Sequence, residues 1–126
     1  MLEIGLTFQS TITVNNNNTA IALGSGDLEV FATPAMIALM ENAAMKAIAG
    51  ELEEGSTSVG TAMNSSHVKA SSLGAQIVAT AEVTSVEGRK ITFKVEARDA
   101  DGLIGEGEHT RFVVDKTKFM QKVKSL

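Results

Sequence analysis

The chain has 126 residues, of which 44% are hydrophobic and 21% are charged, a balance typical of one globular domain spanning 1–126 with a core of its own. It contains no cysteine, which excludes disulfides, thiolate metal sites and a cysteine nucleophile, and its two histidines lie too far apart in the chain to suggest a zinc site. The net charge is −4 and the basic residues are not clustered, which argues against a nucleic-acid partner.

The N-terminal residues 1–5 lack the basic segment and long apolar run of a secretion signal, and no segment reads as a membrane span. We therefore expect a cytoplasmic protein that has no membrane partner and needs neither a metal nor a separate cofactor.

The first part of the chain predicts short extended segments. Residues 6–14 are β-branched and alternate, which is typical of a strand, and residues 15–18 are four asparagines that favour a turn. Residues 19–23 are compatible with a second short strand, which the glycine-rich residues 24–27 end. Residues 28–32 then lead into a helix.

Residues 34–49 predict that helix, with its boundaries marked. Thr33 is a candidate N-cap, Pro34 suits the first helical position, and Gly50 suits the residue just past the end. The helix is apolar almost all round and too short to span a bilayer, which takes about 20 apolar residues. We expect the rest of the chain to wrap around it.

Glu41 is a charged residue at a position where the pattern predicts burial. Asn42 and Lys46 form a narrow polar stripe along the helix, but Glu41 lies off this stripe, on a face with Ile37 and Met45. A carboxylate in apolar surroundings costs free energy unless it has partners. One interpretation is a structural pair with a basic residue of a strand, and the other is a reactive carboxylate.

After an acidic connector at residues 51–57, four segments predict strands: 58–69, 76–86, 89–99 and 103–115. Glu87-Gly88 and Asp101-Gly102 indicate tight turns between the last three. The clearest alternation places Ile91, Phe93, Val95 and Ala97 inward. Residues 116–124 predict a short terminal helix whose apolar side is Phe119, Met120 and Val123.

Segregated elements of this kind indicate an α+β fold in which an antiparallel sheet of five to six strands curls around one long central helix. Such a sheet leaves one face and one edge uncovered, so we expect a homodimer.

Several polar residues allow two interpretations each. His67, near a strand end, is a structural residue or an acid/base group. The strand that carries His109 and Arg111 is either a polar edge strand that contains several glycines, or part of a binding site. In the second interpretation the glycines leave room for a ligand beside the positive charge of Arg111. Thr33 is a complete helix cap by itself, yet its hydroxyl also lies at the positive end of the helix dipole, where an oxyanion is stabilised.

The order and spacing of several motifs resemble the hotdog-fold thioesterases similar to fluoroacetyl-CoA thioesterase. The resemblance covers nearly the whole chain and is carried by Val30-Phe31-Ala32-Thr33-Pro34-Ala35-Met36, Leu39-Met40-Glu41 with Ala43, Ser58-Val59-Gly60-Thr61 with His67, Ala81-Glu82-Val83, Val86-Glu87-Gly88-Arg89-Lys90 and Ile104-Gly105-Glu106-Gly107-Glu108-His109-Thr110-Arg111.

The resemblance implies a hotdog fold and the hydrolysis of a small acyl-CoA thioester to free acid and CoA. It matches the family's catalytic threonine, glutamate and histidine to Thr33, Glu41 and His67. It also implies that the substrate is contacted by Gly60, Arg111 and Phe31. Only the reaction class is carried over, not a fluorinated substrate.

Two alternatives remain at this point. One is a hotdog protein that binds acyl-CoA without hydrolysing it. The other is an enoyl-CoA hydratase, which ranks lower because that chemistry usually pairs an aspartate and a histidine on one short segment, and His67 has no neighbouring aspartate.

Overall fold

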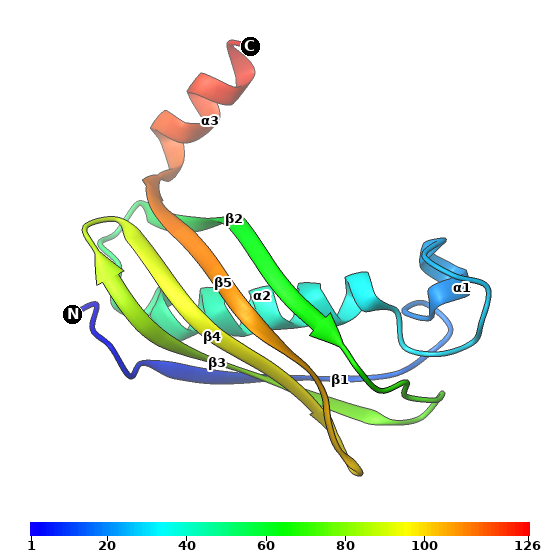
Figure 1. Ribbon diagram of the computed structural model, residues 1–126. Helices are drawn as coiled ribbons and strands as arrows, with labels where there is room; N and C mark the ends of the chain where they lie inside the picture. The colour runs from blue at the N-terminus through cyan, green and yellow to red at the C-terminus, as the bar shows by residue number, and fades with distance from the viewer.

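The computed structural model describes residues 1–126. Five strands and three helices follow one another along the chain: β1 (Thr7–Thr13), α1 (Ala20–Leu23), α2 (Thr33–Ala49), β2 (Ser56–His67), β3 (Gln76–Glu87), β4 (Lys90–Asp99), β5 (Gly102–Asp115) and α3 (Lys116–Lys124). Helix α2 lies along one face of a single curved sheet, as Figure 1 shows. The predicted α+β fold, with the sheet curled around one long helix, is confirmed.

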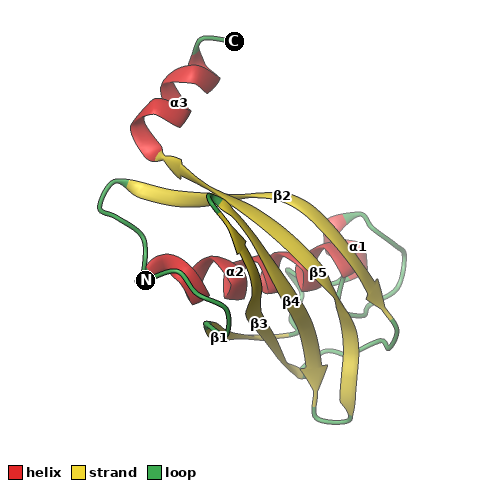
Figure 2. Ribbon diagram, turned by 60° about the vertical axis from the view of Figure 1, so that its left-hand side comes forward, coloured by secondary structure: helices red, strands yellow, loops and turns green.

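The sheet has five strands in the order β1-β3-β4-β5-β2, and every neighbouring pair is antiparallel. Strands β3, β4 and β5 form consecutive hairpins, whose turns use Gly88 (φ 63°) and Gly102 (φ 127°) in backbone conformations that favour glycine. Strand β2 is different, because it crosses to the far edge and pairs with β5 alone. Figure 2 shows the sheet curling over α2, with β1 and β2 at its two edges.

The core lies between α2 and the inward face of the sheet. The predicted inward residues of β4 are all fully buried, as is the alternating set on β3: Ile77, Ala79, Ala81 and Val83. From α2 the core receives Met36, Leu39, Met40, Ala43, Ala44, Ala47 and Ile48. The inward-facing side chains of the strands therefore pack against the buried face of the helix.

The helix is covered on one face only, which corrects the expectation that the chain wraps it completely. Pro34 and Ala38 are exposed, while Ile37 and Met45 are half-buried. Glu41 lies on this same half-open face. The predicted polar stripe of Asn42 and Lys46 is also only partly exposed to solvent, because Asn42 accepts a hydrogen bond from the Ser10 hydroxyl at 2.7 Å.

Two local predictions are wrong. Residues 20–23 form a helical turn and not a strand, because Thr19 caps it through Ala22 N–H and Gly24 ends it at φ 71°. Thr33 is not a cap either. Ala32 holds that position with extended angles, no side chain caps the helix, and Thr33 is the first helical residue.

Strand β5 is not the edge of the sheet, because β4 and β2 flank it on both sides. Its glycines do not leave room for a ligand. A Cβ added at Gly105 would lie 2.6 Å from the sulfur of Met36, and one added at Gly107 would clash with the backbone of β2. These glycines instead allow α2 and β2 to approach the strand closely.

Helix α3 was predicted with its correct bounds and stands away from the sheet (Figure 1). None of the three helices is both long and apolar enough to cross a membrane.

Candidate active site

His67 and Thr33 meet where the end of β2 passes the start of α2. Thr33 Oγ1 lies 2.8 Å from His67 Nδ1, which fixes the orientation of the imidazole. The other ring nitrogen, Nε2, is buried and has no hydrogen-bond partner. An unpartnered buried nitrogen is costly, so this atom is available to a water molecule, a substrate or another protein group.

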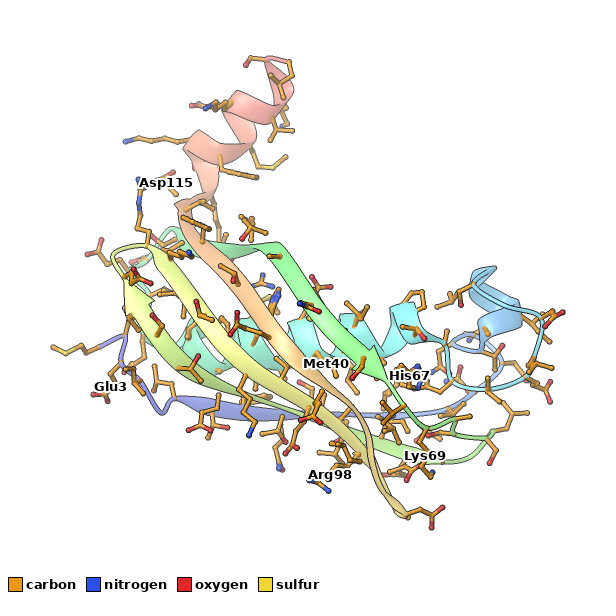
Figure 3. The ribbon with its side chains drawn as sticks, viewed as in Figure 1. Glu3, Met40, His67, Lys69, Arg98 and Asp115 are labelled. Atoms are coloured by element: carbon orange, nitrogen blue, oxygen red, sulfur yellow. The ribbon has the colours of Figure 1, made fainter.

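A cavity of about 270 Å³ opens beside this pair. Thr33 and His67 line it together with Phe31, whose side chain is 1% exposed, and with residues of the β2–β3 connection and the segment before α2. Figure 3 shows His67 and Lys69 on the side of the molecule where α1 lies, whereas Asp115 lies at the opposite end of the sheet.

Glu41 lies in a second place, against the middle of β2. A Cβ added at Gly60 would lie 3.0 Å from Glu41 Oε2, so the absence of a side chain there lets the carboxylate rest on the strand. Glu41 itself forms no hydrogen bond or ion pair. It lines a cavity of about 310 Å³ that Gly60 and Arg111 also line.

Arg111 is 7% exposed and is held in place by Ser58 and His109. Its Nε donates to Ser58 Oγ at 2.7 Å, and its Nη2 donates to the Ser58 carbonyl at 2.9 Å. Its Nη1 lies 3.2 Å from His109 Nε2. The guanidinium therefore has a fixed orientation and places positive charge next to the Glu41 cavity.

Burial lowers the pKa of both histidines below their ordinary value of 6.5. For His109 the Arg111 charge lowers the pKa further, while the Glu41 charge and the bond to Ala62 oppose the shift. Burial also lowers the pKa of Arg111, and the Glu41 carboxylate opposes that shift. Both imidazoles are therefore neutral at pH 7, a state in which a histidine can accept a proton.

The predicted site residues thus fall into two groups within one chain. Thr33, His67 and Phe31 line one cavity, and Glu41, Gly60 and Arg111 line the other. Glu41 follows Thr33 by eight residues on the same helix, a rise of about 12 Å along the axis. One copy of the chain does not bring Glu41 into contact with His67.

Sequence reasoning did not identify Ser58 as a partner of Arg111. The two residues are far apart in the chain and meet only because β2 pairs with β5. A short local motif carries no signal of that pairing. The structure also contains no group of three or more His, Asp or Glu side chains arranged to hold a metal ion.

Comparison with known proteins shows which family the chain belongs to. Residues 14–117 match the family FlK, described as fluoroacetyl-CoA-specific thioesterase. The fluoroacetyl-CoA thioesterase of Streptantibioticus cattleyicolor is 45% identical over 96 residues, which cover 76% of this chain and 69% of that protein.

Solved structures show the same likeness over nearly the whole chain. The fluoroacetyl-CoA thioesterase FlK superposes with a TM-score of 0.93 at 37% identity, covering 99% of this chain and 97% of that one. A thioesterase superfamily member from Thermus thermophilus has a TM-score of 0.90 at 26% identity, covering 98% and 91%. A hot-dog-like protein from Thermanaerovibrio acidaminovorans, at 23% identity, has a TM-score of 0.88 and covers 97% and 90%, which supports the fold alone.

The hotdog fold and the thioesterase resemblance inferred from the sequence are therefore confirmed, and the chain belongs to the fluoroacetyl-CoA-specific thioesterase family as a hydrolase of small acyl-CoA thioesters.

Proposed function

We propose that this thioesterase cleaves short acyl-CoA esters with Glu41, His67 and Thr33 as its catalytic residues. The observation that carries the proposal is the 2.8 Å contact between Thr33 Oγ1 and His67 Nδ1, which leaves His67 Nε2 buried and free. A neutral imidazole held in this way can take a proton from an attacking water and return it to the departing thiolate.

Hydrolysis adds water to the acyl carbon and breaks the carbon–sulfur bond, so CoA leaves with the thiol proton. Glu41 serves this step in one of two ways. Its carboxylate attacks the acyl carbon to give a mixed anhydride that water then opens, or it takes a proton from the attacking water. In both cases Arg111 stabilises its negative charge.

The oxyanion that forms on the acyl carbon needs hydrogen-bond donors. No side chain caps the start of α2, Pro34 has no N–H, and Met36 N–H bonds to the Ala32 carbonyl, so the N–H groups of Thr33 and Ala35 are the proposed donors. The helix dipole adds favourable potential at the same place. The reaction as proposed uses only the side chains of the protein, its backbone amides and water, without a separate cofactor.

The separation of the two groups of residues supports a site shared between two copies of the chain. Strand β2 is an edge strand of 12 residues that carries no Asp, Glu, Lys, Arg or Pro. Natural proteins rarely leave so long an edge unprotected, because it pairs readily with another strand. We infer a homodimer in which β2 pairs antiparallel with β2 of a second copy.

That pairing brings the two halves of the site together. We place the two-fold axis near Met63, a register that puts His67 of the partner subunit beside the Val59–Gly60 stretch. Glu41 rests against Gly60. The proposed dimer therefore contains two equivalent sites, each with the carboxylate of one copy and the imidazole of the other.

Small acyl groups are the proposed substrates. The related FlK acts on fluoroacetyl-CoA, and a threonine-to-serine variant of it was solved with acetyl-CoA. Acetyl-CoA and propionyl-CoA are the first esters to test. The cytoplasm, where acyl-CoA esters are formed and used, stays the predicted location.

The test is a thiol-release assay on the purified protein with straight-chain acyl-CoA esters of graded length. We expect turnover of the short esters and a loss of about 100-fold or more in kcat for Glu41→Gln. Glu82→Gln, which changes an exposed glutamate on the outer face of β3, is the matched control and keeps full activity. Full activity in a folded Glu41→Gln protein excludes the assignment, and tight binding without turnover in the wild type indicates a non-catalytic binder.

A further inference from the structure

His109 is a buried histidine that the proposed reaction does not use. It lies on β5, is 1% exposed, and stacks on the Phe93 ring at a centroid distance of 6.0 Å. Both of its ring nitrogens are engaged. Nδ1 lies 2.8 Å from the Ala62 carbonyl oxygen, and Nε2 lies 3.2 Å from Arg111 Nη1.

These two partners fix the protonation of the ring. A carbonyl oxygen only accepts hydrogen bonds and a guanidinium only donates them. Nδ1 must therefore carry the proton, and Nε2 must be the acceptor. The site requires a neutral imidazole in one tautomer, which neither an apolar residue nor a lysine can replace.

Ala62, which accepts the bond from Nδ1, lies next to the only register shift in the β2–β5 pairing. Gly60 pairs with Arg111 and Ala62 pairs with Thr110, so Thr61 is an extra residue on β2. An extra residue of this kind is a β-bulge, which bends the strand and redirects its backbone groups. The bulge lies at the point where Glu41 rests on Gly60.

The bond to Arg111 completes the anchoring of the guanidinium. Three of its five N–H groups bond to Ser58 Oγ, the Ser58 carbonyl and His109 Nε2. One N–H remains on each terminal nitrogen, and Arg111 lines the same cavity as Glu41. Without the bond to His109, Nη1 has no hydrogen-bond partner in this network, and only Nε and Nη2 remain held by Ser58.

We propose that His109 is a positioning residue, which holds the Arg111 guanidinium so that its free N–H groups face the Glu41 carboxylate and the bound acyl group. The inference rests on the proposed function, since it assigns Arg111 a role at the Glu41 site. It acts on the reacting groups through Arg111 and not by contact with the substrate.

Two isosteric variants separate the two bonds of His109. In His109→Gln the amide oxygen reaches the place of Nε2, so it keeps the acceptor for Arg111 and loses the donor to Ala62. In His109→Asn the amide nitrogen reaches the place of Nδ1, so it keeps the donor to Ala62 and loses the acceptor for Arg111. A purely structural role predicts that both variants lose activity only in proportion to their loss of stability.

We expect kcat to fall about tenfold or more in His109→Asn with little change in KM, whereas His109→Gln stays within about threefold of wild type. In an Arg111→Lys background, His109→Asn has no further effect, because the residue through which it acts is already altered. Thermal unfolding of each variant is measured alongside. Equal losses in the Asn and Gln variants, or additive losses with Arg111→Lys, overturn the proposal.

A second readout does not depend on turnover. Nitrogen-15 NMR of the histidine rings at pH 7 distinguishes the neutral tautomers, and we expect His109 protonated on Nδ1 alone. A ring protonated on Nε2, or on both nitrogens, overturns the proposal even in an active enzyme. If the wild type hydrolyses no acyl-CoA ester, the proposed function fails separately, while the NMR result still decides the geometry of His109 and Arg111.

Discussion

Gly60 determines how closely β2 can approach the Glu41 carboxylate. A Cβ at this position would lie 3.0 Å from Glu41 Oε2 and 3.1 Å from His109 Cε1, both tighter than ordinary contacts. The backbone of Gly60 does not need glycine for its conformation, because its φ is not positive. The requirement for glycine is therefore one of space at the site.

This predicts the effect of Gly60→Ala. The added methyl displaces the carboxylate or the His109 ring, so we expect kcat to fall by about tenfold or more, equivalent to about 1.4 kcal/mol in the activation free energy. Gly50→Ala is the matched control, because a Cβ there meets nothing within 4 Å and its φ of −72° suits alanine. A Gly60→Ala enzyme as active as Gly50→Ala contradicts the placement of Glu41 against Gly60.

At the scale of the elements, β2 contributes residues to both parts of the proposed site. Its last residue, His67, contacts Thr33, and its bulge lies beside Glu41. Its outer edge is unpaired within the chain, whereas its inner edge pairs with β5 along 11 of its 12 residues. The proposed dimer depends on that outer edge.

Charges on the β2 edge are therefore expected to dissociate the dimer. The double change Ala62→Lys with Asn64→Lys places four lysines around the proposed two-fold axis, and like charges opposite each other destabilise strand pairs. The matched control puts two lysines on the other edge strand, at Thr11 and Thr13 of β1, which are also exposed. Sedimentation equilibrium should show monomer for the β2 variant and dimer for the β1 variant. The reverse pattern assigns the interface to β1.

At the scale of the whole molecule, the proposed shared site makes activity a property of the proposed dimer. Glu41→Gln and His67→Ala proteins are each expected to be inactive. After unfolding and refolding together, about half of the dimers are mixed, and each mixed dimer contains one site with both natural residues, so about a quarter of wild-type activity returns. No recovery of activity in a mixture that refolds and exchanges subunits places the whole site within one copy.

The two histidines with lowered pKa predict how stability depends on pH. Their folded pKa values lie below 6.5, so between those values and 6.5 the unfolded chain binds more protons than the folded chain. The stability they contribute is complete above about pH 7 and is lost as the pH falls through this window. The lowered pKa of Asp99 acts only below its ordinary value of 3.8, outside this window.

The measurement is calorimetry at about pH 7.5 and pH 5 on wild type and His109→Gln. We expect the melting temperature of the wild type to fall on acidification and that of His109→Gln to fall less, because one of the two histidines is gone. An equal fall in both proteins contradicts the assignment of this dependence to His109.

The sequence by itself determined most of the elements and the reaction class. Alternation in residues 76–99 and the boundary residues and apolar composition of residues 34–49 are local signals, because each depends only on residues that are near neighbours in the chain. Glycines at the tight turns marked the hairpins in the same way. The motifs around Thr33, Glu41 and His67 were distinct enough to indicate a thioesterase before any contact was known.

Only the tertiary structure decided how these parts meet. The pairing of β2 with β5 is non-local, because its register is set by the packing of residues about 50 positions apart, so no short motif contains it. This pairing places Arg111 in the interior with Ser58 and His109 instead of at an exposed edge. It also holds His67 close enough to engage the Thr33 hydroxyl, so that a residue with every local feature of a helix cap instead orients the candidate catalytic histidine.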